Sequence, residues 1–263
     1  MIKEFLTSLF ESPKLKEAKS FGHLYESIAL IAREERCSEA WMPHRNQCKK
    51  FILESLKLSL HFESVLILGS GPIHEIPIEE LSKKFKKVVC VDIVHLKSTK
   101  KRVQHLKNIE FREHDLTESE SELTKGILKT VVPTAFTNEN WGLVLSVNIM
   151  SQLPRHLEEY IDKNFKGKFS EEQVNAYLEM ITQNHLRYLE TFHSPVALIT
   201  DTEVHYLDSN NKMLENHLEF QHLKLPTPKT EWIWDLAPIP EFQKDIAIKM
   251  KVRAYHLNNR NSH

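Results

Sequence analysis

Cysteine and glycine are both scarce in this chain. Its 263 residues include three cysteines, at positions 37, 48 and 90, and six glycines. An odd number of cysteines without metal-type spacing argues against a disulfide framework and structural zinc, so we expect a reduced, cytoplasmic setting and no metal. Average glycine usage is about 7%, so most turns here are made by other residues. Two glycines close together therefore indicate a local need for backbone freedom or close approach.

Strong net charge and long hydrophobic runs are missing too. The formal net charge of -1 creates no overall field that would attract nucleic acid or an anionic membrane. No run reaches the roughly 18 apolar residues of a membrane helix, and we see no secretion signal. The basic runs Lys83–Lys87 and Lys97–Arg102 are balanced by the acidic run Glu118–Glu122. We therefore expect no membrane or nucleic-acid partner, while the oligomeric state stays open.

Short apolar runs rich in β-branched residues begin after Ser64 and alternate with helical or polar segments. We expect strands at Val65–Leu68, Val88–Val91, Ile109–Phe111, Leu143–Val147 and Val196–Thr200, and helices at Ile76–Phe85, at Leu96–Leu106 and from Ser170 onward. Because most of these runs are apolar throughout, they are typical of parallel strands covered on both faces by helices. Alternation at Ile246–Val252 predicts an antiparallel strand with one wet face, and we expect a further strand around Leu218–Leu225.

Residues 1–62 have helical periodicity and are expected to form an extension that caps the sheet domain of residues 63–263. One helix is expected at Phe21–Arg36 and a second at about Arg45–Leu60. We expect the break at Pro43, because proline lacks the backbone N–H that a helix interior needs. The prediction is an α/β domain with a mostly parallel sheet and a helical N-terminal extension.

A Gly-x-Gly turn ends the first expected strand. The stretch VLILGSGPIHE places Gly69, Ser70 and Gly71 between an apolar run and a helical segment. The next strand ends VVCVD, so Asp92 lies 21 positions after Gly71 (92 − 71). In open parallel sheets ligands bind beyond the carboxyl ends of the strands. An acidic residue about 20 positions after such a turn can accept both vicinal hydroxyls of a ribose.

Polar positions also follow the third and fourth expected strands. Asp115 and Leu116 come after the third, and Asn148 comes directly after the fourth. In this order the motifs of residues 64–205 resemble the class I S-adenosylmethionine-dependent methyltransferases. The resemblance implies a Rossmann-like methyltransferase fold with helices on both faces of the sheet. It also implies that S-adenosylmethionine is the cofactor and that a small molecule accepts the methyl group by in-line transfer.

The resemblance gives each of these residues a role. Gly69, Ser70 and Gly71 would lie under the cofactor, Asp92 would bind the ribose hydroxyls, Asp115 and Leu116 would flank the adenine, and Asn148 would border the methionine portion. The chain departs from the family at Ile67, where an acidic residue often stands, and at Ile73, where the third glycine stands.

Three alternative functions follow from the same residues. Ile67 and Ile73 favour a catalytically degenerate member of the fold that binds a nucleotide-like ligand or a protein partner. The basic runs could bind RNA phosphates, so an RNA methyltransferase is a further alternative. A dinucleotide-dependent dehydrogenase fits less well, because His74 stands where that fingerprint needs a glycine for close helix–strand packing.

The sequence contains no certain catalytic residue, since the cofactor carries the reactivity and a base is needed only for a protonated nucleophile. Asp201, Glu203 and His205 follow the fifth strand and share one face if the chain stays extended. His205 or Glu203 could act as a base, the three could bind a divalent metal, or they could anchor a loop. Candidates for substrate contact are Arg33, Arg36, Trp41 and His44, with Glu231–Pro238 as a second wall.

Overall fold

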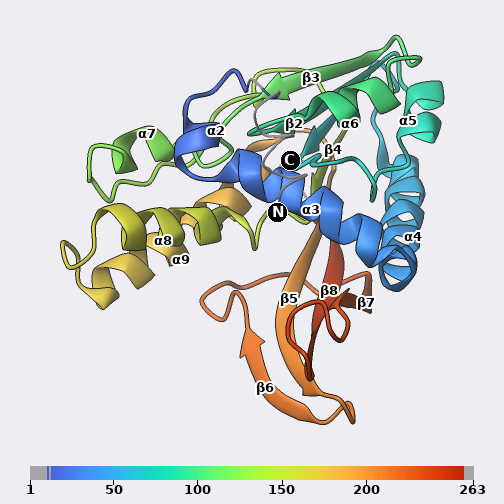
Figure 1. The fold of residues 1–263 in the computed structure, drawn as a ribbon. Helices are drawn as coiled ribbons and strands as arrows, with labels where there is room; N and C mark the ends of the chain where they lie inside the picture. The colour runs from blue at the N-terminus through green and yellow to red at the C-terminus, as the bar shows by residue number, and fades with distance from the viewer. Residues whose placement is uncertain (1–10, 12, 258–263) are drawn as a thin grey trace.

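The computed structural model describes residue 11 and residues 13–257, and in them helices lie around the parallel part of one mixed sheet, while β6 and the ends of β5 and β8 beside it project beyond the helices (Figure 1). The strands are β1 (Ser64–Leu68), β2 (Lys87–Asp92), β3 (Ile109–Glu113), β4 (Leu143–Val147), β5 (Val196–Asp208), β6 (Met213–Leu218), β7 (Thr230–Ala237) and β8 (Ile246–Leu257). Their order in the sheet is β3-β2-β1-β4-β5-β8-β7. β5 is long enough to pair with β4 through residues 196–199 and with β6 through residues 203–207.

The strand directions confirm the Rossmann-like methyltransferase fold. β1 to β5 run parallel, and β8 runs antiparallel to both β5 and β7. The expected strand at 218–225 is wrong beyond its first residue, since β6 ends at Leu218 and β7 is the partner of β8. Phe220 instead buries its side chain from a turn, and Leu223 and Leu225 are partly buried against the same cluster, so their apolar character reflects core packing and not strand pairing.

Helices occupy most of the segments between strands. They are α2 (Glu17–Ser20), α3 (His23–Arg36), α4 (Ser38–Ser55), the 3₁₀ turn η1 (Leu56–Leu58), α5 (Ile78–Lys84), α6 (Lys97–Arg102), α7 (Glu120–Leu123), α8 (Leu153–Asn164) and α9 (Glu171–Thr191). The expected capping box starts α9: Ser170 Oγ accepts from Gln173 N, and Ser170 N donates to Gln173 Oε1. Across residues 13–257, none of these helices combines the length and apolar character that crossing a membrane requires.

The core has an apolar cluster on each face of the sheet, because each central strand sends side chains to both sides. In β1, Ile67 belongs to one cluster while Leu66 and Leu68 belong to the other, and all three are fully buried. Helix α4 adds Trp41 to the first cluster, and α9 adds Tyr188 to the second. This burial on both faces is what continuous apolar strands predict.

The expected helix break at Pro43 is wrong, because α4 continues through the proline and the break lies at Cys37. Trp41 and His44, on either side of Pro43, are 1% and 0% exposed. The indole N–H of Trp41 also donates to Leu236 O at 2.9 Å. Proline in a helix interior costs about 3 kcal/mol, and burial of these aromatic groups against β7 offsets that cost.

We expect Trp41→Ala to lower the free energy of unfolding by about 3–5 kcal/mol, because it leaves a cavity in the core and removes the bond to Leu236. Met42→Ala, at the neighbouring position, changes a side chain that is 52% exposed and should cost less than about 0.5 kcal/mol. Urea unfolding of both variants measures the difference. Equal losses would mean that α4 does not depend on its contact with β7.

Candidate functional site

A cavity of about 280 Å³ opens at the carboxyl ends of the parallel strands. Its wall includes every residue that the resemblance assigns to the cofactor: Gly69, Ser70, Gly71, Asp92, Asp115, Leu116 and Asn148. Helix α3 supplies another part of the wall through His23, Glu26 and Arg33, and α8 supplies a further part through Arg155 and His156. The convergence follows from parallel pairing, which brings these strand ends to the same edge of the sheet.

The glycine turn after β1 needs its glycines for two different reasons. Gly69 has φ +72°, and a Cβ there would lie 2.4 Å from Cβ of Ile149, so the turn packs directly on the segment after β4. Gly71 has φ +45° and faces open space. Ile73 also has positive φ, at 57°, so it adopts the left-handed backbone that a glycine would take, although its side chain is buried and β-branched.

The carboxylate of Asp92 points toward this turn. Gly71 N donates to Oδ2 at 2.7 Å, and Ile93 N donates to Oδ1 at 2.8 Å. Burial raises the pKa of the Asp92 carboxyl, while these two backbone N–H groups oppose the rise. Each oxygen keeps lone-pair capacity beyond one N–H, so the carboxylate can also accept hydroxyl groups from a ligand in the cavity.

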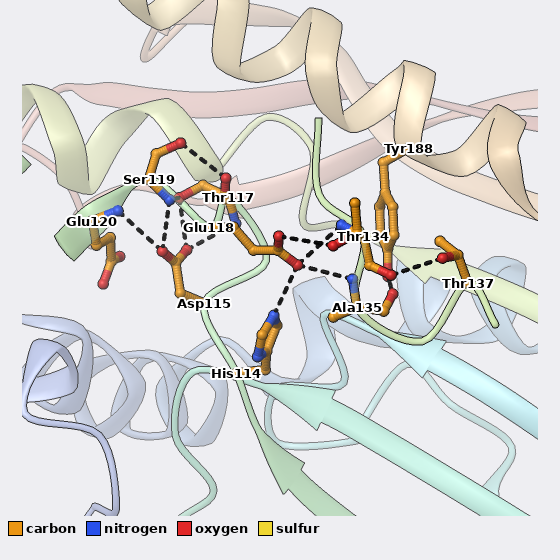
Figure 2. Close-up of polar contacts among 10 residues, drawn as sticks. All are labelled: His114, Asp115, Thr117, Glu118, Ser119, Glu120, Thr134, Ala135, Thr137 and Tyr188. Carbon is orange, nitrogen blue, oxygen red and sulfur yellow. Dashed lines mark hydrogen bonds and ion pairs between the residues drawn. The ribbon is translucent and has the colours of Figure 1, made fainter. Parts of the chain in front are cut away.

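Asp115 uses its carboxylate to shape the loop after β3 (Figure 2). Oδ1 accepts from the backbone N and Oγ1 of Thr117, and Oδ2 accepts from the backbone N of Ser119 and of Glu120 at 3.0 Å. Asp115 thereby holds the N–H groups at the start of α7. Its carboxylate is therefore occupied by the loop, and the cavity wall at this point depends on that arrangement.

Glu118 ties the same loop to the segment that precedes β4 (Figure 2). Its Oε1 accepts from the backbone N of Thr134 at 3.1 Å and of Ala135 at 2.9 Å, and lies 3.3 Å from Nε2 of His114. Tyr188 of α9 donates through its hydroxyl to Ala135 O at 2.7 Å. These bonds fix the loop to α9, so its conformation needs no ligand.

The three candidate catalytic residues do not share one face. Register shifts between Asp201 and Glu203, where β5 has one extra residue opposite β8, and this bulge turns the two side chains apart. Asp201 is 2% exposed, lines the cavity and accepts from Ser151 Oγ. Glu203 lies outside the cavity wall, 3.2 Å from Nε2 of His205 and 3.1 Å from the guanidinium of Arg253.

Asp201, Glu203 and His205 therefore do not face one another in the way that a shared metal site would need. Within residue 11 and residues 13–257, no group of three His, Cys, Asp or Glu side chains is arranged to hold a metal ion. Asp201 instead lies 3.9 Å from the guanidinium of Arg155 on α8, an ion pair at the cavity wall.

Of the four candidates in the N-terminal extension, only Arg33 lines the cavity. Arg36 turns away and donates twice to Glu241, at 2.6 and 3.0 Å. Trp41 and His44 are buried behind the wall, where His44 stacks on Trp234 with ring centroids 4.0 Å apart. From the segment expected as a second wall, Trp234 and Leu236 line the cavity.

Sequence reasoning missed His23, Glu120 and His156, which line the cavity together. Nε2 of His23 lies 2.5 Å from Oε1 of Glu120, and the rings of His23 and His156 have centroids 4.2 Å apart. Burial lowers the pKa of His156 to about 3, and the nearby His23 and Arg155 add to this effect.

These three residues come from three different helices, so no local spacing connects them. For His156, the signal in the sequence was the amphipathic pattern of α8. Pro154 at its start and the buried pair Leu157 and Ile161 mark an amphipathic helix, which would have brought His156 to the site.

Among the described residues, carboxylates outnumber cations in the wall of the cavity: Arg33 and Arg155 are the two cationic residues there, against the seven acidic residues Glu26, Glu75, Asp92, Asp115, Glu120, Glu159 and Asp201. Glu26 of α3 and Glu159 of α8 both line it, and burial together with the charge of Glu159 raises the pKa of Glu26. Arg33 and Arg155 supply the opposing positive charge. This charge balance favours a ligand that carries a positive charge.

Comparison with known proteins found no matching family model and no matching curated protein. Among solved structures, a DhpI–SAH complex is 14% identical over 85% of this chain and 93% of that chain, with TM-score 0.38. A complex of human N-acetylserotonin methyltransferase with SAM is 16% identical over 74% and 41%, with TM-score 0.32. A complex of the Haloferax volcanii Trm112 methyltransferase activator with the putative methyltransferase is 8% identical over 89% and 96%, with TM-score 0.41. The fold assignment rests on the strand order and not on these superpositions.

The two glycines of the turn should respond differently to alanine. Gly71→Ala should cost about 1–2 kcal/mol of folding free energy, the penalty of a left-handed backbone alone, because no atom lies within 4 Å of the new Cβ. Gly69→Ala should cost clearly more, since Ile149 must also move. Thermal unfolding of the two variants compares them directly. Equal losses would contradict the close packing of the turn on Ile149.

The half-buried ring of His156 should make the protein sensitive to acid. Its folded pKa of about 3 lies below the ordinary 6.5, so between these values the unfolded chain binds one more proton and stability falls as pH falls. His156→Phe should therefore reduce the loss of unfolding free energy between pH 6.5 and 5 by about 1.5 kcal/mol. Urea unfolding at several pH values tests this, with His193→Gln as the control for losing a histidine from the surface. An unchanged pH slope in the phenylalanine variant would contradict the prediction.

Proposed function

We propose that the protein is an S-adenosylmethionine-dependent methyltransferase that acts on a small molecule. The observation that carries the proposal is the Asp92 carboxylate, held against the glycine turn by the bond from Gly71 N at 2.7 Å, inside a cavity at the carboxyl ends of the strands. A carboxylate in this position can accept the two hydroxyls of a ribose.

The wall of the cavity suits the rest of such a cofactor. Open space in front of Gly71 leaves room for the nucleoside close to the backbone. Ile93 and Leu116, which follow β2 and β3, line the cavity and would offer apolar surface to a purine base. Asn148 lines the cavity next to the turn and has a buried amide atom without a hydrogen-bond partner in the described chain, so it can receive a polar group of the ligand.

The cofactor would supply a methyl group activated by a sulfonium. The protein's contribution is to bind, orient and exclude water, because geometry alone can account for about 7–11 kcal/mol of the barrier in the best cases. The carboxylates of Glu26, Glu159 and Asp201 on the wall favour the positively charged form of such a ligand. Helix α3 forms part of the cavity wall and would limit the access of water to a bound ligand.

His23 is the group best placed to take a proton from an acceptor molecule. If Nε2 keeps its proton and donates to Glu120 at 2.5 Å, then Nδ1 is free to accept one. Glu120 is 3% exposed and would hold the ring in this tautomer. This assignment replaces His205 and Glu203, which lie outside the cavity wall.

The proposal predicts that calorimetric titration with S-adenosylhomocysteine gives saturable binding to the wild-type protein. Asp92→Asn should weaken this binding by about 10- to 100-fold, because a hydrogen bond to a charged group contributes roughly 1.5–3 kcal/mol. Asp245→Asn, at an exposed aspartate outside the cavity, is the matched control and should bind as the wild type does.

Absence of binding by the wild-type protein at millimolar ligand would refute the methyltransferase proposal. Binding without turnover on a broad panel of acceptor molecules would favour the catalytically degenerate alternative. Salt-sensitive binding of RNA would favour a nucleic-acid substrate.

A further inference from the structure

Asn148 lies between a buried histidine and the cavity. It follows β4 with φ 51°, is 8% exposed, and its backbone N donates to Ile199 O at 2.9 Å. One branch of its amide lies 3.2 Å from Nε2 of His44. The other branch is buried and has no hydrogen-bond partner within the described residues, and Asn148 lines the cavity. The identity of the atom on each branch therefore decides what the site offers to a ligand.

Trp232 determines which nitrogen of His44 carries the proton. The indole N–H can only donate, and it lies 3.0 Å from Nδ1 of His44. Nδ1 must therefore accept, and a neutral imidazole then has its proton on Nε2. Burial lowers the pKa of His44 to about 3, with a contribution from Arg45, so the ring is neutral near pH 7.

The tautomer of His44 in turn orients the amide of Asn148. Nε2–H needs an acceptor, and an NH₂ group 3.2 Å away would face one donor with another. The Sγ of Cys48, 3.6 Å from Nε2, is only a weak acceptor and does not remove that conflict. The amide oxygen and nitrogen have the same shape, so the oxygen faces His44 and the NH₂ group takes the other branch.

We propose that Trp232 and His44 are positioning residues that turn the NH₂ group of Asn148 toward the cavity as a donor for a carboxylate oxygen at the amino-acid end of the bound cofactor. The proposal rests on the proposed function for the identity of this ligand. Asn148 lies on the cofactor side of the site, because the flanking residues Val147 and Ile149 pack against the glycine turn at Gly69. A buried NH₂ group without a partner is costly, and a ligand oxygen would satisfy it.

The contacts from Trp232 to His44 and from His44 to Asn148 form a relay, which joins parts of the chain that are far apart in sequence. His44 belongs to α4, Asn148 follows β4 and Trp232 belongs to β7. His44 is held on its flat face by Trp234, with an interplanar angle of 7°. The orientation of the Asn148 amide therefore depends on the contacts of His44 with Trp232 and Trp234, and these contacts involve neither the glycine turn nor Asp92.

The first experiment needs no ligand. Nitrogen-15 NMR of the wild-type protein, labelled at histidine, should find Nδ1 of His44 unprotonated and Nε2 protonated at pH 7. Its signals are identified by contact with the Trp232 indole proton. Trp232→Phe should keep the aromatic packing, remove the donor and allow the other tautomer to appear. A proton on Nδ1 of His44 in the wild type would overturn the proposal.

The second experiment compares two ligands that differ only at the amino-acid end. Asn148→Asp replaces the NH₂ group by an anionic oxygen of the same size. It should weaken S-adenosylhomocysteine at least 10-fold in calorimetric titration and leave methylthioadenosine, which lacks the amino-acid carboxylate, unchanged. Trp232→Phe should weaken S-adenosylhomocysteine about 3- to 10-fold with the same selectivity. Ile233→Ala, at a position 48% exposed, is the control and should change neither affinity.

The outcomes separate this proposal from the proposed function. Equal weakening of both ligands, or unchanged affinity for S-adenosylhomocysteine in Asn148→Asp, would overturn the role of Asn148. If the wild type binds neither ligand, the proposed function is refuted, and with it the proposal that Asn148 donates to the cofactor. If the wild type binds S-adenosylhomocysteine but carries the proton of His44 on Nδ1, the proposed function is still supported and the relay is refuted.

Discussion

Parallel pairing of β1 with β2 and β4 is the constraint on which the site depends. It brings Gly71, Asp92 and Asn148 to one edge of the sheet although they are far apart in sequence. The pairing is stabilised by burial, because the side chains of these strands are buried on both faces of the sheet. The contact of Gly69 with Ile149 then fixes the distance between the turn and the segment after β4.

Aromatic packing joins the N-terminal helices to the C-terminal strands. Trp41 packs edge-on against Trp234 with centroids 5.0 Å apart, and His44 stacks on the same ring. Helix α4 is therefore anchored to β7, and α3, which precedes it directly, is held across the cavity. The N-terminal helices and the C-terminal strands thus both contribute to the wall of the site, beside the strand ends in the middle of the chain.

Polar groups in the wall divide into those that shape the protein and those left for a ligand. Asp115, which lines the cavity, and Glu118, which lies behind the wall, both use their carboxylates to accept backbone N–H groups and so shape the loop after β3. Asp92 keeps acceptor capacity, and Asn148 has a branch of its amide unsatisfied. Buried polar groups are normally paired, and our proposal assigns this unsatisfied branch to a contact with the ligand.

The sequence by itself determined the parallel strands, the glycine turn and the acidic residue that ends β2, because continuous apolar runs and scarce glycines are local signals. It could not determine that α4 runs through Pro43, since the packing that offsets the proline comes from β7, far along the chain. Nor could it separate Asp201 from Glu203 and His205, because the bulge arises only when β5 pairs with β8. The tertiary structure alone brought His23, Glu120 and His156 together, since side chains on three different helices meet only when those helices pack.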